Sequence, residues 1–158
     1  MPNALPKEVE IDRPLQRLIT LRLLRLSSKL NAQAARLLKE SAGISINQWR
    51  MFVMVKAHGE ITPAEIVRQT GFDKGLISRT LKRMVEDGLL TSTISESDGR
   101  SHVMRMTGKG FELYERARPS MHRRRDRLES ALTTSELAML YDAFDRLECA
   151  IEDLEAQQ

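Results

Sequence analysis

Residues 61–107 constrain the fold more than any other segment, because they carry local start and stop signals for two short helices and then a strong turn signal. The first helix is expected over residues 63–69. Thr62 can cap it, Pro63 occupies the first helical position, where the missing N–H is harmless, and Glu65 completes a capping box. These signals are local, so they predict a helix start without reference to the rest of the chain.

A second helix is expected from Lys74 to the residues before Gly88. Gly71 can adopt the positive φ of a tight turn, and the carboxylate of Asp73 can cap the helix that follows. The apolar residues of this helix repeat at nearly 3.6-residue spacing and are Leu76, Ile77, Leu81, Met84 and Val85. The pattern predicts two short helices packed through apolar faces and joined by a turn.

The opposite face of the second helix carries Gly75, Ser78, Arg79, Lys82 and Glu86. Arginine can bind guanine through two hydrogen bonds, serine and lysine bind phosphates, and glycine permits close approach. Lys74 adds a cation in the first turn, where it opposes the helix dipole, so helix stability alone does not explain it. A solvated polar face would have a similar composition, and the helix by itself leaves both interpretations open.

Two runs with β-branched residues, 89–95 and 102–107, flank the step Asp98-Gly99 and predict a β-hairpin with Arg100 near its tip. An arginine there can enter the narrow minor groove of DNA, and Asp98 can hold the tip by pairing with a nearby cation. A plain surface turn also favours Asp and Gly. After a helix of the recognition type, the DNA interpretation is preferred.

These segments resemble the MarR family of bacterial transcriptional regulators. Residues 73–81 are similar to its recognition helix, and residues 86–90 are similar to the exit into its wing. Residues 98–101 resemble its Asp-x-Arg wing signature, and residues 106–107 resemble its closing Leu-Thr, with Met in place of Leu. The helix order fits over roughly residues 15–154.

The resemblance implies a mainly α protein: a winged helix-turn-helix with a two-stranded β-hairpin wing, and N- and C-terminal helices that form a dimerisation bundle. We expect one domain over residues 1–158, with a winged module at 45–107 and a linking helix at 108–127. The expected DNA-binding residues are Lys74, Gly75, Ser78, Arg79, Lys82, Asp98, Gly99, Arg100 and Ser101. The linking helix is expected to start after Thr107 and to be interrupted near Pro119, which lacks a backbone donor.

The two ends of the chain carry opposite charge and matching apolar stripes. Residues 13–41 hold seven basic residues and one acidic residue, whereas residues 128–158 hold one basic and eight acidic residues. The C-terminal stripe steps by three and four and consists of Leu137, Leu140, Phe144, Leu147, Ile151 and Leu154. The N-terminal stripe consists of Leu15, Ile19, Leu23, Leu26, Leu30, Ala34 and Leu37. The stripes can fold onto each other within one chain, but dimerisation through helices at 13–41 and 128–156 is preferred.

Several function classes have no support in the sequence. A single cysteine, Cys149, excludes an internal disulfide, and its acidic neighbours do not activate a thiolate. The three histidines lack the spacing of a helical metal site, and no phosphate loop, catalytic carboxylate pair or nucleophile elbow is recognisable. The longest wholly apolar run, 51–55, is too short to span a bilayer. We therefore expect a cytoplasmic protein that is not an enzyme and holds no cofactor or metal.

The expected function is sequence-specific binding of a pseudo-palindromic operator by a homodimer, as a repressor. The rival interpretations are a winged helix used for protein contact and a nonspecific architectural DNA binder. In the family that the chain resembles, small aromatic or phenolic effectors bind between the dimer helices and the winged module. The residues that fit such a pocket, or equally a plain core, are Trp49, Met51, Phe52, Met54, Arg22 and Arg25. The arginines at 116, 118, 123, 124, 125 and 127 can contact phosphate, the acidic tail or water.

Overall fold

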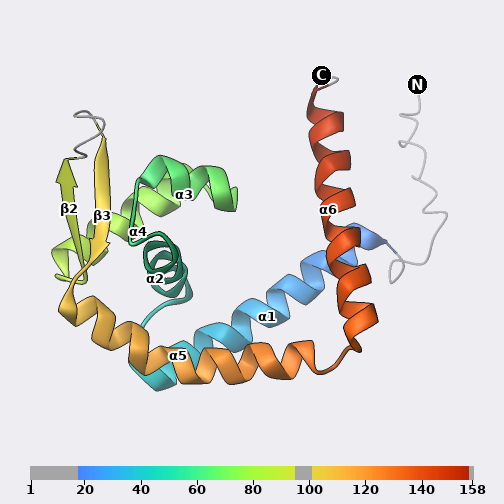
Figure 1. Ribbon diagram of the computed structural model, residues 1–158, viewed down its shortest axis with the longest axis horizontal. Helices are drawn as coiled ribbons and strands as arrows, with labels where there is room; N and C mark the ends of the chain where they lie inside the picture. Colours follow the sequence, from blue (N-terminus) through green and yellow to red (C-terminus); the bar gives the residue numbers. More distant parts are fainter. Residues whose placement is uncertain (1–17, 95–100, 157–158) are drawn as a thin grey trace, which may run out of the picture.

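The structure is a computed structural model that describes residues 18–94 and 101–156. Two long helices, α1 and α5, lie side by side and form a base, with a compact winged module at one end and α6 rising at the other (Figure 1). The described elements are, in chain order, α1 (Ile19–Ala42), α2 (Ile46–His58), β1 (Glu60–Ile61), α3 (Pro63–Thr70), α4 (Lys74–Glu86), β2 (Leu90–Ile94), β3 (His102–Met106), α5 (Gly108–Glu129) and α6 (Thr134–Ala156).

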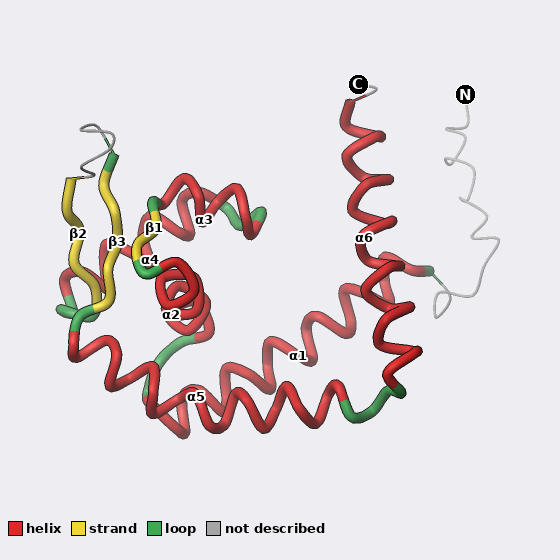
Figure 2. The backbone as a smooth tube through the Cα atoms, viewed as in Figure 1, coloured by secondary structure: helices red, strands yellow, loops and turns green. Residues whose placement is uncertain are grey.

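The sheet has three strands in the order β1-β3-β2, and both pairings are antiparallel. The predicted hairpin is therefore confirmed as β2 and β3, but the expectation of only two strands was incomplete (Figure 2). The additional strand, β1, pairs Ile61 with Met104. A strand of two residues is too short to show an alternation of apolar and polar residues in the sequence. The pairing of β1 with β3 accompanies the burial of Ile61, which is only 2% exposed.

The main core lies where α2, α3, α4 and the base of the wing meet. Phe52, Ile66 and Met84 are fully buried there. Leu90, the first residue of β2, is buried in the same core. A continuous apolar core links the helix-turn-helix to the hairpin, so burial sets the position of α4 relative to the wing.

The α1–α5 base is held by a second part of the same core. Leu38 and Ala34 of α1 and Ala117 and Met121 of α5 are all buried. The predicted interruption near Pro119 was wrong, since α5 continues through this residue. Ala117 and Met121 flank the proline and pack against the core, and this packing keeps the helix continuous despite the missing backbone donor.

Helix α6 begins at a capping box: Thr133 Oγ1 accepts from the backbone N–H of Glu136 at 3.2 Å, and Glu136 Oε2 accepts from that of Thr133 at 2.8 Å. None of the described residues of α6 is buried. Leu140, Ile151 and Leu154 of the predicted stripe are 38%, 55% and 63% exposed. The fold of one chain therefore leaves this apolar face uncovered.

Within the described ranges, no helix is long and apolar enough to cross a membrane.

Candidate nucleic-acid interface

The starts of α3 and α4 are fixed by local hydrogen bonds at the predicted positions. Thr62 Oγ1 accepts from the backbone N–H of Glu65 at 3.2 Å, and Glu65 Oε2 accepts from that of Thr62 at 2.8 Å. These hydrogen bonds favour the carboxylate and lower the pKa of Glu65. Gly71 then takes the left-handed conformation at φ 64°, and Asp73 Oδ1 accepts from the N–H of Leu76 at 2.7 Å. The start of α4 is thereby held in a defined direction.

Helix α4 buries one face and exposes the other. Ile77, Leu81 and Met84 enter the core. The side chains expected to bind DNA lie outside it: Lys74, Ser78, Arg79 and Lys82 are exposed and Gly75 is half-buried. Lys82 lies 3.9 Å from Glu86, and because both side chains are exposed this ion pair has little effect on stability. The predicted face is therefore present as one solvent-accessible surface.

Gly75 has a neighbour that the sequence did not indicate. A Cβ atom added there would lie 3.0 Å from Nη1 of Arg79 and 3.1 Å from Oδ1 of Asp73. The absence of a side chain at Gly75 therefore gives room to the Arg79 guanidinium. Both neighbours are the ends of exposed side chains, so a Cβ atom at this position would require only a small shift of the Arg79 guanidinium.

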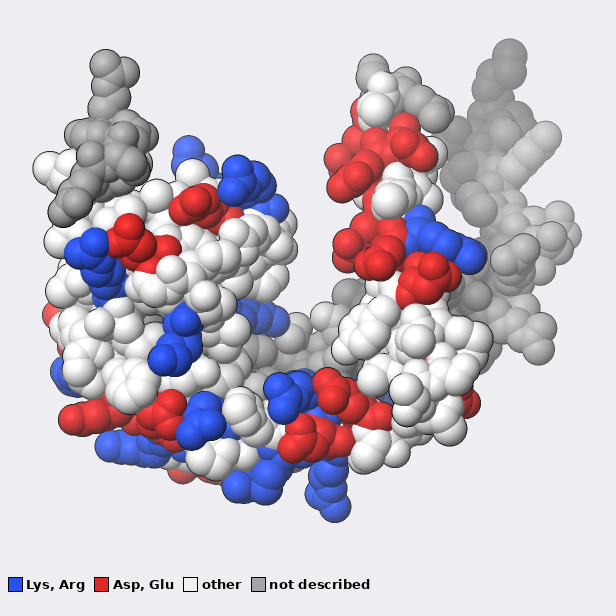
Figure 3. Space-filling model, viewed as in Figure 1, with Lys and Arg blue, Asp and Glu red and all other residues white. Residues whose placement is uncertain are grey.

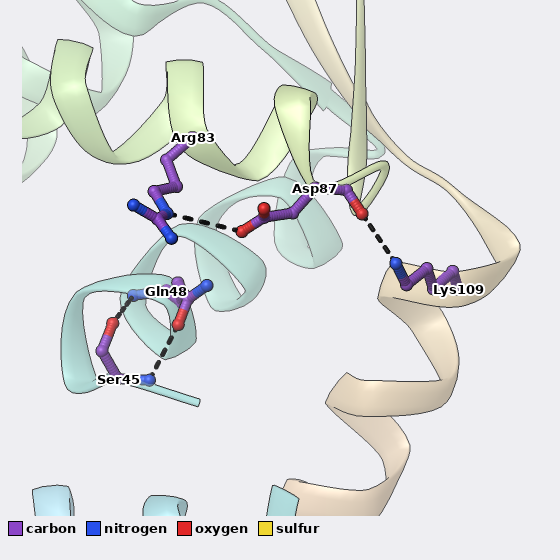
Figure 4. Close-up of polar contacts among 5 residues, drawn as sticks. All are labelled: Ser45, Gln48, Arg83, Asp87 and Lys109. Carbon is purple, nitrogen blue, oxygen red and sulfur yellow. Dashed lines mark hydrogen bonds and ion pairs between the residues drawn. The ribbon is translucent and has the colours of Figure 1, made fainter. Parts of the chain in front are cut away.

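The other side of α4 faces the start of α2. Figure 4 shows Arg83 extending toward the first turn of α2, with its Nε 3.8 Å from Asp87 Oδ2. The backbone carbonyl of Asp87 accepts from Lys109 Nζ at 2.8 Å, so the end of α4 is also joined to α5. A capping box of Ser45 and Gln48 starts α2 next to this cluster. Arg83, which the sequence pattern did not place on the outer face, lies on the side of α4 that faces α2.

The tip of the wing, including Asp98, Gly99 and Arg100, lies outside the described residues, so these predictions stay predictions. Ser101 is described and half-buried, and it lines a hollow of about 740 Å³ between α3, α4 and the start of β3. A second hollow of about 390 Å³ continues between α4 and the sheet. Pro63, Ser78 and His102 line both hollows, which therefore form one groove along the wing side of α4.

The groove contains two polar residues that the sequence pattern did not indicate. Ser92 of β2 and His102 of β3 both line it, and Ser92 Oγ lies 3.1 Å from His102 Nδ1. Both residues are exposed. Only the strand register could have shown them, because Ile94 pairs with His102 and Ser92 with Met104, which brings the two side chains together across the hairpin.

A basic hollow of about 780 Å³ lies between α1 and α5, far from the α4 face. Its charged lining residues are Arg36 of α1 and, from α5, Asp126 and three of the arginines considered above, Arg123, Arg124 and Arg127. Arg124 donates to the backbone carbonyl of Leu30 at 3.1 Å and to Gln33 Oε1 at 3.2 Å, and partial burial lowers its pKa. Acidic side chains run along α6 in Figure 3.

The residues considered for an effector pocket have mostly structural surroundings. Met51 and Phe52 are buried in the core, which is the simpler of the two interpretations. Trp49 stacks on Tyr114 of α5 with the ring centroids 5.2 Å apart. Cys149 is exposed as a free thiol, and within the described part of the chain no cluster of His, Cys, Asp and Glu forms a metal site.

Comparison with known proteins agrees with this geometry. The MarR family model matches residues 42–101. An uncharacterized HTH-type transcriptional regulator of Staphylococcus aureus is 33% identical over 76 residues, which is 48% of this chain, so the chain spans about half, 52%, of that relative. Two solved structures share the fold over much more of the molecule, and the identities below 25% make this a statement about fold.

The first is a MarR/EmrR family transcriptional regulator from Acinetobacter sp. ADP1, with a TM-score of 0.82, 23% identity, and coverage of 89% of this chain and 99% of that one. The second is a mutant of MarR from E. coli in complex with operator DNA, with a TM-score of 0.66, 24% identity, and coverage of 85% and 98%. The winged module, residues 42–101, therefore matches the MarR family model, and the described fold as a whole is the winged helix-turn-helix fold of the two solved regulators.

Proposed function

We propose that this protein is a sequence-specific reader of duplex DNA that represses transcription as a homodimer. The observation that carries the proposal is the outer face of α4, where Lys74, Ser78, Arg79 and Lys82 are all exposed on a helix whose start is fixed by caps. An α-helix fits the major groove, and these side chains are those that bind guanine edges and phosphates there. The solved E. coli MarR complex has the same fold and is bound to operator DNA, which supports this use of the surface.

In this proposal Arg79 reads a base edge, Lys82 and Lys74 contact phosphates, and Gly75 gives clearance. Arg100 enters the minor groove from the wing, with Asp98, Gly99 and Ser101 shaping its tip. The difference between a base contact and a phosphate contact is measurable, because only the first discriminates among sequences.

The homodimer is supported by the exposed apolar face and the charge of α6. Met139, Ile151 and Leu154 are more than half exposed, and water contact with such an extended stripe is unfavourable. The basic hollow of α1 and α5 offers a complementary charge to the acidic α6 of a second copy. A two-fold dimer places two copies of α4 about one DNA turn, ~34 Å, apart on an inverted repeat.

Release by a small aromatic or phenolic effector is part of the proposal. Such a ligand must favour a dimer geometry that does not fit successive grooves. A tenfold release requires a differential affinity of about 1.4 kcal/mol between the two geometries. The test is the loss of operator affinity on addition of small phenolic compounds.

The decisive experiment is selection of duplexes from a random pool by the purified protein at physiological salt, with the Arg79→Ala/Arg100→Ala double variant in parallel. We expect the wild type to enrich an inverted repeat and the variant to lose this enrichment. Salt-dependent binding without sequence preference would instead identify an architectural DNA binder. No duplex affinity in a folded dimer would identify a winged helix that contacts protein.

Two single variants then separate the assigned roles. Arg79→Ala is expected to weaken binding to the selected operator by ~1–3 kcal/mol and to relax the sequence preference of the protein. Lys82→Ala should weaken binding to all duplexes alike. It should also reduce the slope of log affinity against log salt concentration by about one, the value for one phosphate contact. Titrations of operator and random duplex at several salt concentrations measure both effects. Equal losses on both duplexes for Arg79→Ala would exclude a base-reading role for this residue.

A further inference from the structure

The groove between α4 and the wing has a role that follows from the shape of DNA. The proposed function places α4 in the major groove and the wing in the adjacent minor groove. These two grooves of B-DNA are separated by a single phosphodiester backbone. One backbone must therefore pass between α4 and the wing, along the groove that the described residues already form.

The walls of this groove fit a phosphate backbone. Lys74, Ser78 and Lys82 line it from α4, and all three side chains are exposed. Among the described residues, the acidic ones that line it are Glu86, next to Lys82, and Glu65, whose carboxylate accepts hydrogen bonds from Thr62. Two cations and a hydroxyl on one wall provide the positive potential and hydrogen-bond donors that a phosphate requires.

The wing side supplies a second set of donors. Ser92 and His102 line the groove opposite Lys82, and the 3.1 Å contact between Ser92 Oγ and His102 Nδ1 joins the two side chains. When the Ser92 hydroxyl donates to Nδ1, the proton of a neutral imidazole lies on Nε2, which then acts as a donor. In this arrangement the Nε2–H group of His102 can bind an anionic oxygen.

We propose that His102, oriented by Ser92, is a phosphate-binding residue that holds the DNA backbone between α4 and the wing. This inference rests on the proposed function. It adds a contact that comes from the hairpin itself, below the tip that carries Arg100. Because both strands of the hairpin contribute to it, the contact also fixes the wing relative to the backbone that separates the two grooves.

The test compares His102→Ala with His58→Ala on the selected operator at pH 8. His58 is a matched control, because it is also exposed, has its Nε2 3.0 Å from Oε1 of Gln69, and does not line the groove. We expect His102→Ala to lose roughly tenfold in affinity, the range of one hydrogen bond to a charged group. His102→Gln, which keeps an N–H donor, should recover part of the loss, and His58→Ala should bind like the wild type.

Operators with one neutral methylphosphonate at successive backbone positions locate the contact. At the phosphate that His102 contacts, neutralisation should lower the operator affinity of the wild type and of Lys82→Ala. It should not lower the affinity of His102→Ala any further. The salt dependence should be unchanged in His102→Ala, because loss of a neutral donor releases no counterion. If His102→Ala binds the operator as well as His58→Ala, the inference is wrong while the proposed function stands. If the wild type selects no duplex at all, both are wrong.

Discussion

A methyl group added at Gly110 is expected to disturb the junction between the wing and α5. Gly110 is buried in the first turn of α5, and a Cβ atom there would lie 2.1 Å from the backbone oxygen of Leu89. Carbon contacts become favourable only near ~3.5 Å, so the two backbones must separate by roughly 1 Å. No rotamer change can relieve this clash, because both groups belong to rigid backbone.

The junction has little freedom to absorb such a shift. The Leu89 carbonyl accepts from the N–H and the hydroxyl of Thr107, each at 3.1 Å, and the same hydroxyl accepts from the N–H of Gly110 at 3.0 Å. Overpacking costs ~1–3 kcal/mol, and loss of the Thr107 cap costs about 1 kcal/mol more. Because alanine has a better helix propensity than glycine, the substitution also stabilises the helix by about 1 kcal/mol. The net expectation for Gly110→Ala is a destabilisation of ~2 kcal/mol.

Urea unfolding at fixed protein concentration measures this difference, since dimerisation makes stability depend on concentration. With an m-value of about 2 kcal/mol/M, the midpoint should fall by roughly 1 M. Gly108→Ala is the matched control, because a Cβ atom there has no neighbour within 4 Å. Operator affinity should also fall for Gly110→Ala alone, since Leu89 directly precedes β2. Equal midpoints for the two variants would refute the steric argument.

Three further results are expected. Phe52→Ala removes a fully buried ring and should destabilise the protein by ~3–5 kcal/mol in the same urea assay, and a loss below ~1 kcal/mol would contradict its place in the core. Glu65→Ala removes a carboxylate whose pKa is lowered in the folded protein. The variant should therefore be less stable than the wild type at pH 7, and this difference in unfolding free energy should shrink as the pH falls below the ordinary carboxyl pKa of 4.5. A difference that does not change with pH would exclude the charged cap. Ile151→Asp/Leu154→Asp should shift the dimer toward monomer in sedimentation, and an unchanged dimer would exclude α6 from the interface.

The sequence predicted the features that neighbouring residues decide. Thr62 and Asp73 fix where α3 and α4 begin, because a cap acts on backbone groups only two or three residues away. The apolar repeat then divides α4 into a buried and an exposed face, so its outer residues follow from the order of the amino acids alone. The capping box at Thr133 is equally local, since it joins residues only three apart in the chain.

Tertiary structure decided the features that depend on residues distant in the chain. The third strand exists because Ile61 is buried against the sheet, and α5 stays continuous at Pro119 because the flanking residues pack in the core. The contact between Ser92 and His102 follows from the register of two strands. Local hydrogen bonds determine where a helix starts, but only the packing of separate elements determines which side chains face the same groove.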